Sequence, residues 1–364
     1  MLINKSVAQK LSKVNFTLCK YLCTQSFKTK VIVSKSTCPF ENLAYENFIY
    51  EKEAFLDNQK TLLIWRNKSS VIIGRHQNPW KEVNLKRLQE NNIYLCRRMS
   101  GGGSVYHDLG NVNFTFFSSK ANYNRKENLD FIINTLKRHF EISLERNEKD
   151  DIIFENKYKV SGTAAKLGLK TCYHHCTLLC DSNLSNLSGL LTNPFGNNIE
   201  TNATESVKSV TMNLFGNNSF DFEKIVDSCS SSFFNQYSKS VISPGFHVVD
   251  PKLINHVSDQ AKELQSWKWT YGKSPKFSIH RDLIYENGEK VNVKLTIHKG
   301  KIHDFEIACD RNHEIVFSIF SKLCGHEFRE SSILPVLLEL SRNVKYLPIC
   351  LQLSKWFEDV NMTD

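Results

Sequence analysis

The apolar residues follow two different spacings along the chain, and each spacing predicts a kind of secondary structure. Val112, Phe114 and Phe116 occupy every second position, which is typical of a half-buried strand. Between Leu129 and Phe140 the apolar residues instead recur at helical spacing. The same patterns predict further helices at residues 43–56, 82–91, 184–191, 221–237 and 251–264. They predict further strands at residues 61–65, 70–74, 93–98, 152–160 and 173–179.

The pattern changes near residue 276, where strands and helices are grouped instead of mixed. Strands are expected at residues 277–285, 291–298 and 301–308, and helices at 313–323, 331–342 and 351–358. Residues 192–219 are rich in Asn, Ser and Thr, so we expect mainly loop there, with one strand near Val207–Val210. We therefore predict a large α/β domain, residues 41–275, and a small C-terminal α/β accessory domain, residues 276–364.

Length and composition exclude several classes of protein. A chain of 364 residues favours two packed units, and 41% hydrophobic with 23% charged residues allows a buried core and argues against disorder. No uninterrupted apolar run approaches the ~20 residues that a membrane helix requires. We therefore expect a globular protein with no membrane association.

Most of the net charge comes from the N-terminus. Residues 1–40 contain seven lysines, no arginine and no acidic residue, so the formal net charge of +9 leaves only +2 for the rest of the chain. A nearly neutral body argues against nucleic-acid binding. An acid-free basic N-terminus is typical of a transit peptide, and we expect residues 1–40 to be a leader and extension that direct the protein to the mitochondrial matrix. A disordered basic tail is the alternative.

The cysteine pattern favours free thiols. The eleven cysteines have no regular spacing, and no secretory signal accompanies them. Cys172, Cys176 and Cys180 flank His174 and His175, but no CxxC pair is present, and a strand would point the two histidines to opposite faces. We therefore expect no metal site.

The densest chemical signal is the glycine run Gly101-Gly102-Gly103. Adjacent glycines permit positive φ and let main-chain N–H groups approach an anion closely. Arg98 beside the run adds a planar donor suited to phosphate or carboxylate. The run is not a dinucleotide fingerprint, because Tyr106 stands where the last glycine should be, and it is not a P-loop. A glycine-rich hairpin and an anion cradle both remain open for it.

Two further segments carry candidate chemistry. Lys159 ends a predicted strand just before Ser161 and Gly162, so it could present an ammonium group to a ligand, or it could be an exposed lysine at a turn. The segment from His174 to Leu179 could be a core strand with one buried, hydrogen-bonded histidine. Neither segment is decisive alone.

The order and spacing of these segments resemble those of the lipoate–protein ligase A family, and within it the mitochondrial lipoyltransferases. The resemblance covers about residues 41–310, and its motifs are highly specific as a set. They are Ile73-Gly74-Arg75-His76-Gln77-Asn78-Pro79-Trp80, the run from Arg97 to Asn111, Lys159-Val160-Ser161-Gly162-Thr163-Ala164, the run from His174 to Leu179, and Trp267 to Phe277.

The resemblance implies a biotin/lipoate-ligase-type fold with a mixed sheet. It implies transfer of a lipoyl group from lipoyl-adenylate, or from a lipoylated H protein, to a lysine of a lipoyl domain. The family's acceptors are acyltransferase subunits of 2-oxo acid dehydrogenases and the glycine-cleavage H protein. No tightly bound cofactor is implied, and Mg²⁺ is implied only if the chain, like the full ligases, also makes the adenylate from lipoate and ATP. We expect a monomer.

The resemblance also assigns roles to residues. Lys159 would contact both the acyl carbonyl oxygen and the phosphate, because an activated ester needs positioning and electrostatic stabilisation rather than a protein nucleophile. The remaining residues would surround lipoyl-adenylate. They are Gly101, Gly102 and Gly103 with Arg98 and Tyr106 beside them, Ser161 and Thr177 at the nucleotide, and Lys149, Val207 and Ser209 closing over it. Trp65 could line an acyl tunnel or simply belong to the core.

Two other functions are considered. Cys176 next to His175 could form a thioester, as in related octanoyltransferases, although strand alternation separates the two side chains. A protein that only docks lipoyl domains would keep an acceptor surface without turnover.

Overall fold

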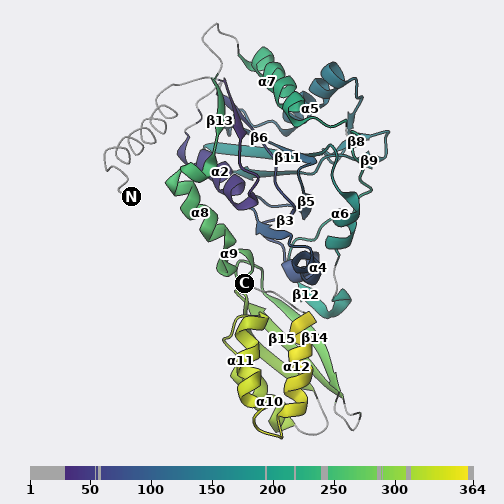
Figure 1. The fold of residues 1–364 in the computed structure, drawn as a ribbon, viewed down its shortest axis with the longest axis vertical. Coiled ribbons are helices and arrows are strands. Elements are labelled where there is room, and N and C mark those ends of the chain that lie inside the picture. Colours follow the sequence, from purple (N-terminus) through teal and green to yellow (C-terminus); the bar gives the residue numbers. More distant parts are fainter. Residues whose placement is uncertain are drawn as a thin grey trace, which may run out of the picture.

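The two units of the molecule are arranged along its long axis, the larger one above the smaller in Figure 1. The computed structural model describes residues 29–53, 55, 59–192, 195–216, 219–238, 245–284, 288, 290–308 and 313–359. Most of the predicted leader, residues 1–28, lies outside the described residues.

The larger unit is built on a six-stranded mixed sheet, which confirms the predicted fold class. The strand order is β10-β11-β6-β2-β1-β13. Pairing is antiparallel from β10 to β2 and parallel from β2 through β1 to β13. The strands are β1 (Thr29–Ser34), β2 (Lys60–Trp65), β6 (Asn111–Ser119), β10 (Thr163–Leu167), β11 (Thr171–Leu179) and β13 (Gly245–Val249).

Strand β1 corrects the predicted N-terminal boundary. All six of its residues are buried, and it pairs with β2 on one side and β13 on the other. Residues 29–34, which we had assigned to the leader and extension, therefore form an inner strand of the sheet. The lysine content masked this strand, because Lys30 is 6% exposed and its ammonium pairs with Glu53 at 2.9 Å.

The two faces of the sheet are covered differently. Phe114 and Phe116 pack beneath α5 (Arg125–Phe140) and α7 (Phe222–Tyr237), which lie side by side above the sheet in Figure 1. On the opposite face, α2 (Pro39–Lys52) and α8 (Asn255–Gln265) cover one part of the sheet. The rest of that face carries polar side chains and forms the floor of a cavity.

Two small sheets frame this cavity. One pairs β3 (Ser70–Ile73) with β4 (Tyr94–Arg97) and β5 (Val105–His107), and the other pairs β7 (Glu145–Arg146) with β8 (Ile152–Phe154) and β9 (Tyr158–Lys159). The single strand that we predicted over residues 152–160 is instead the β8–β9 hairpin. Glu155 and Asn156 turn it with φ of 51° and 55°, a left-handed pair that hairpin turns require.

A third prediction, for the segment that follows the 3₁₀ turn Gly196–Asn198 and β12 (Ile199–Thr201), is also wrong. The strand expected near Val207–Val210 is irregular backbone, and a strand forms earlier, at β12. Only Thr211 makes a strand-like bridge, to Lys159, and one bridge is too little to build a strand. Short helices complete this side of the unit. They are α3 (Pro79–Glu82), α4 (Leu85–Glu90), α6 (Leu184–Leu190) and the 3₁₀ turn Gly196–Asn198.

The C-terminal unit has the predicted order of strands and helices. It comprises β14 (Phe277–Ile284), β15 (Lys290–His298), β16 (Lys301–Ala308), α10 (His313–Leu323), α11 (Glu330–Leu340) and α12 (Leu347–Asp359). Strand β12 pairs with β14, so the larger unit contributes a strand to this sheet. Trp80 also packs against Phe277 and Phe328, with ring centroids 4.9 and 5.6 Å away, and so joins the two units.

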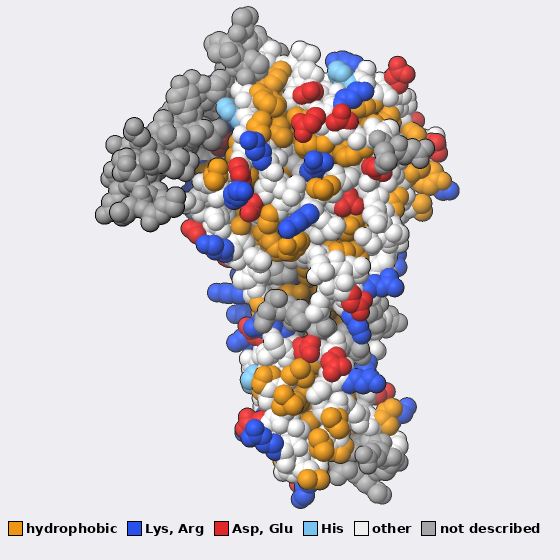
Figure 2. Space-filling model, in the orientation of Figure 1, with side chains coloured by type: hydrophobic (Ala, Val, Ile, Leu, Met, Phe, Trp, Pro, Cys, Tyr) orange, Lys and Arg blue, Asp and Glu red, His pale blue; other side chains and the backbone are white. Residues whose placement is uncertain are grey.

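Two surface properties follow from this arrangement. In the described part of the chain, none of the helices combines the length and apolarity needed to cross a bilayer. On the face in Figure 2, acidic and basic side chains are interspersed rather than gathered into a basic stripe.

Candidate active site

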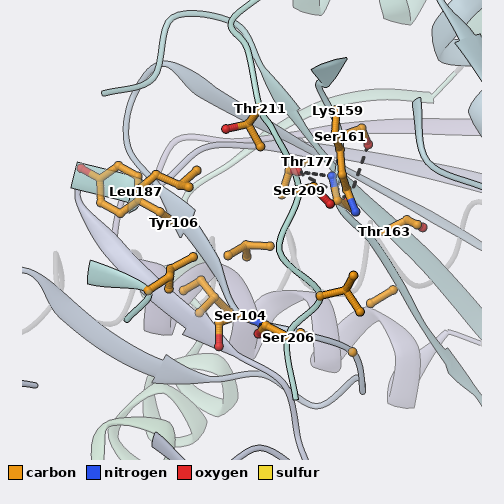
Figure 3. A pocket seen from close by; sticks show the side chains of 18 of the residues that line it. Ser104, Tyr106, Lys159, Ser161, Thr163, Thr177, Leu187, Ser206, Ser209 and Thr211 are labelled. Atoms are coloured by element: carbon orange, nitrogen blue, oxygen red, sulfur yellow. Dashed lines mark hydrogen bonds between the residues drawn. The ribbon is translucent and has the colours of Figure 1, made fainter. Parts of the chain in front are cut away.

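One cavity of about 1600 Å³ brings together nearly all the residues that the sequence singled out. It lies between the glycine run, the β8–β9 hairpin and the segment 204–211 (Figure 3). Ten of the eleven predicted site residues line it, and Gly101 is not among the lining residues. The ten are Arg98, Gly102, Gly103, Tyr106, Lys149, Lys159, Ser161, Thr177, Val207 and Ser209.

The glycine run connects β4 to β5 and has little room for side chains. Gly102 has a φ of +88°, which L-residues rarely adopt. Gly74 lies against it so closely that a Cβ at position 74 would stand 2.0 Å from the Gly102 carbonyl oxygen. Gly101, in contrast, has open space where a Cβ would be. The shape of the loop therefore depends on Gly102 and Gly74 more than on Gly101.

Arg98 holds this loop from inside. Its Nη2 donates to the carbonyl oxygens of Gly101 (2.6 Å) and Gly103 (2.8 Å), its Nη1 to that of Ile72 (3.0 Å), and its Nε to Ser100 Oγ (3.0 Å). Four of the five guanidinium N–H groups are thus engaged with the protein. Arg98 borders the cavity, but this geometry makes it a support for the glycine loop rather than a free anion binder.

Ser100 belongs to a buried hydrogen-bond chain that the sequence analysis missed. Ser100 Oγ donates to His175 Nε2 (2.9 Å), and His175 Nδ1 donates to Glu46 Oε1 (2.8 Å). Glu46 is 1% exposed and also accepts from Thr115 Oγ1 (2.7 Å). Ser100 itself is not among the cavity-lining residues, so the chain anchors the loop to helix α2 and does not present a nucleophile.

Lys159 faces the cavity from the end of β9. Its ammonium lies 2.7 Å from Asp151 Oδ1, and both side chains are partly buried. Its main-chain N–H donates to the Val210 carbonyl oxygen (2.9 Å), which connects the hairpin to the segment 204–211. Asp151 also lines the cavity and is a second residue that the sequence analysis missed, although it directly precedes a predicted strand.

Ser161 and Thr177 lie beside Lys159 in Figure 3. Thr177 Oγ1 accepts a hydrogen bond from the Gly162 main-chain N–H at 2.8 Å, and this bond fixes the turn between β9 and β10. Ser161 is 1% exposed and lies next to the Cys176 thiol. Ser161 and Thr177 therefore form the part of the cavity wall next to Lys159.

The segment 204–211 closes one side of the cavity and is fastened at two places. Ser206 Oγ accepts from the Ser104 main-chain N–H (2.8 Å) and bonds the Glu82 carboxylate. Figure 3 shows Ser206 next to Ser104, which directly follows the glycine run. Val210 is held by Lys159, as described above. Between these points Val207 is 80% exposed, so it borders the cavity with only part of its surface.

Cys176 does not have the surroundings of a nucleophile. It is 3% exposed, and burial raises the pKa of its thiol to about 12. The neighbouring His175 points to the other face of the sheet, as strand alternation predicted, and bonds Glu46 and Ser100. The thioester alternative is therefore disfavoured. No group of three or more His, Cys, Asp or Glu side chains that could hold a metal ion occurs within the described ranges.

Comparison with known proteins identifies the family. Residues 38–234, more than half of the chain, match the model of the lipoyl protein ligase A/B catalytic domain. Among curated relatives, the human lipoyl amidotransferase LIPT1, mitochondrial, is 37% identical over 82% of each chain. The lipoate-protein ligase A of Bdellovibrio bacteriovorus is 33% identical over 86% of this chain and 92% of its own.

Solved structures agree with this match. The P. falciparum protein LipL1, crystallised in complex with lipoate, is 29% identical over 90% of this chain and 98% of its own, with a TM-score of 0.59. The T. acidophilum protein Ta0514, described as a putative lipoate protein ligase with bound lipoic acid, shares the fold at 22% identity and a TM-score of 0.53. The chain therefore belongs, as the sequence motifs indicated, to the lipoate–protein ligase family, and it is an acyltransferase.

Proposed function

We propose that this protein transfers a lipoyl group from lipoyl-adenylate to the ε-amine of a lysine on a lipoyl domain. The observation that carries the proposal is that Gly102, in the β4–β5 loop, and Lys159, in the β8–β9 hairpin, line one cavity. That cavity combines the glycine loop with the Lys159 ammonium and three further lysines, and Trp65 and Ile72 are among its lining residues. These features match an activated acyl ester of a nucleotide better than they match a nucleic acid or a peptide.

The chemistry requires positioning more than a protein nucleophile. The neutral acceptor amine attacks the acyl carbonyl carbon and a C–N bond forms. The bond between that carbon and the phosphate oxygen breaks, AMP leaves with the negative charge, and the nitrogen releases one proton. Lys159 would stabilise both the oxyanion and the phosphate, which preorganised donors do effectively in a site that excludes water. Asp151 would hold the Lys159 ammonium in place until the donor binds.

The acyl donor has two further candidates. A lipoylated H protein could supply the acyl group, and a complete ligase would make lipoyl-adenylate from lipoate and ATP with Mg²⁺. No cofactor is expected to stay bound in either case. We favour the transferase reaction because the curated relative at 37% identity is named an amidotransferase.

The acceptors we propose are the lipoyl domains of 2-oxo acid dehydrogenase acyltransferase subunits and the glycine-cleavage H protein. The mitochondrial matrix is the proposed location, because it fits the basic acid-free N-terminus and the mitochondrial name of the human relative. We propose that the protein acts as a monomer.

One experiment tests donor and reaction together. The purified full-length chain is mixed with an apo-lipoyl domain and given either lipoate plus ATP-Mg or synthetic lipoyl-adenylate, and the acceptor mass is followed. We expect modification with lipoyl-adenylate only. Modification in both mixtures would make the chain a complete ligase. Modification in neither would refute lipoyl-adenylate as the donor, and failure with a lipoylated H protein as well would refute acyl transfer and favour a docking role.

A further inference from the structure

Two buried polar side chains in the cavity lack partners. His107 is 3% exposed and Asn113 is 2% exposed, and both line the cavity. No described residue is hydrogen-bonded to His107 Nε2 or to Asn113 Nδ2. Unpaired buried donors are rare in proteins because each one forfeits its hydration. These two donors are therefore available to a ligand that supplies an acceptor.

A chain of amide groups fixes which His107 nitrogen carries the proton. Asn42 Nδ2 donates to the carbonyl oxygens of Ser36 and Arg66 and to Asn67 Oδ1. Asn67 must then direct its Nδ2 donor toward His107 Nδ1, 3.0 Å away. Burial lowers the pKa of His107 to about 3, so the ring is neutral and its only proton is on Nε2. His107 thus offers an N–H donor to the cavity.

The sheet register places Asn113 between the reacting end and the His107 donor. Thr177, which borders Lys159, is the cross-strand partner of Asn113, and Asn113 is the partner of Trp65. Since neighbouring strands are about 4.8 Å apart, Trp65 lies roughly 10 Å across the sheet from Thr177. The His107 ring packs edge-on against Trp65, with centroids 6.0 Å apart. An acyl chain whose carbonyl lies at Lys159 would pass Asn113 and end beside His107 and Trp65.

We propose that His107, assisted by Asn113, recognises the dithiolane ring of the acyl group and so selects a lipoyl chain over an octanoyl chain. This inference rests on the proposed function, since it deepens the description of the acyl donor. Lipoyl and octanoyl share one carbon chain and differ in the two ring sulfurs. Sulfur is a weak hydrogen-bond acceptor, whereas the end of an octanoyl chain offers none.

The preference for lipoyl over octanoyl would arise because an octanoyl chain leaves the buried His107 N–H without an acceptor. A site built around a buried N–H rejects a ligand that leaves the donor unpaired more strongly than a purely apolar site rejects a missing group. Because sulfur is a weak acceptor, we expect a preference of about tenfold for lipoyl in the specificity constant, at the low end of what buried hydrogen bonds provide.

The test compares two donors on the full-length chain. Transfer to an apo-lipoyl domain is measured with synthetic lipoyl-adenylate and with octanoyl-adenylate, and the kcat/KM ratio is taken for the wild type, His107→Phe and Asn113→Leu. We expect the ratio to fall toward one in His107→Phe and to fall partly in Asn113→Leu. Ile72→Val is the control, because it trims an apolar cavity wall and should change both donors alike.

A binding measurement separates this inference from the proposed function. The lipoyl and octanoyl sulfamate analogues of the adenylate do not react, and their dissociation constants report recognition alone. Tighter binding of the lipoyl analogue, lost in His107→Phe, would support the inference even if transfer failed. Equal binding of both analogues to the wild type, or a preference that survives both substitutions, would overturn it. Should His107→Phe fail to fold, Asn113→Leu still decides the outcome.

Discussion

The Lys159 ammonium lies 2.7 Å from the Asp151 carboxylate, at the end of a two-strand hairpin that faces the cavity. In our proposal the Lys159 ammonium is the positive charge that contacts the reacting centre, and Asp151 is its partner before the donor binds. We expect Lys159→Ala to lower kcat for lipoyl transfer by about 10²–10³-fold, since loss of one preorganised donor costs roughly 2.7–4 kcal/mol in the transition state. Acceptor mass measured against time provides the rate.

The matched control for that change is in the same hairpin. Lys157 is exposed and lies over the Tyr158 ring, so Lys157→Ala removes the same charge without reaching the cavity. Its rate should stay within about twofold of the wild type, because isolated surface charges contribute little. Normal turnover by Lys159→Ala would remove Lys159 from the mechanism.

Asp151 should act through Lys159. We expect Asp151→Asn to lower kcat about fivefold, because a partly buried ion pair contributes about 1 kcal/mol to holding its lysine in place. Asp150→Asn is the comparison, since Asp150 pairs with Arg146 outside the cavity. In the Lys159→Ala background, Asp151→Asn should have no added effect. An undiminished fivefold loss there would give Asp151 a role of its own.

The glycines near the loop should differ sharply in tolerance. Gly74→Ala would place a Cβ 2.0 Å from the Gly102 carbonyl oxygen, so the loop must shift. We expect it to lower the free energy of unfolding by about 1–3 kcal/mol, as overpacking does, and to weaken donor binding. Gly101→Ala meets no atom within 4 Å and should leave both properties unchanged. Urea unfolding and adenylate binding measure the two effects, and equal tolerance at both positions would refute this account of the loop.

Cys176 should be dispensable for chemistry. Burial raises the pKa of the Cys176 thiol to about 12, so almost no thiolate forms near neutral pH. We expect Cys176→Ser to keep lipoyl transfer within about twofold while the protein loses roughly 1–3 kcal/mol of stability from the buried hydroxyl. Cys176→Ala avoids that penalty and serves as the second variant. An acyl-cysteine intermediate trapped by mass spectrometry would contradict the prediction.

Stability should fall in acid. Burial lowers the pKa of His107 and of His174 to about 3, against 6.5 for a free histidine. Below 6.5 the unfolded chain therefore binds protons that the folded chain does not, and stability decreases as pH falls toward 3. The slope should be about 1.4 kcal/mol per pH unit for each histidine. Urea unfolding between about pH 7 and 5 should show a shallower slope in His174→Gln, but not in His303→Gln, which changes an exposed side chain.

The regular elements of the fold were readable from the sequence because their faces are either apolar or polar. Val112, Phe114 and Phe116 alternate and form β6 as expected, although all nine residues of this strand are buried and not only one face as we predicted. Strand β1 was missed because Lys30 interrupts a pattern that is otherwise buried, and its neutralising partner Glu53 lies at the C-terminal end of helix α2. No local spacing reveals such a pair. The β8–β9 turn was missed because its left-handed residues, Glu155 and Asn156, include no glycine.

The sequence predicted those site residues that belong to contiguous motifs, but not those that meet only in the folded protein. The glycine run and Lys159 belong to contiguous motifs, and they do share the cavity. Glu46, in contrast, reaches His175 across 129 positions of sequence, and its carboxylate is recognised as part of the site only when α2 packs on the sheet. The supporting role of Arg98 is also a tertiary property, because its partners are main-chain carbonyl oxygens, which no side-chain pattern identifies.

The position of β1 limits where the chain can be shortened. Because this strand is hydrogen-bonded on both sides, a proteolytic cut after Ser34 would separate β2 from β13 and expose two unsatisfied main-chain edges. Any maturation step that removes the basic leader must therefore cleave on the N-terminal side of Thr29.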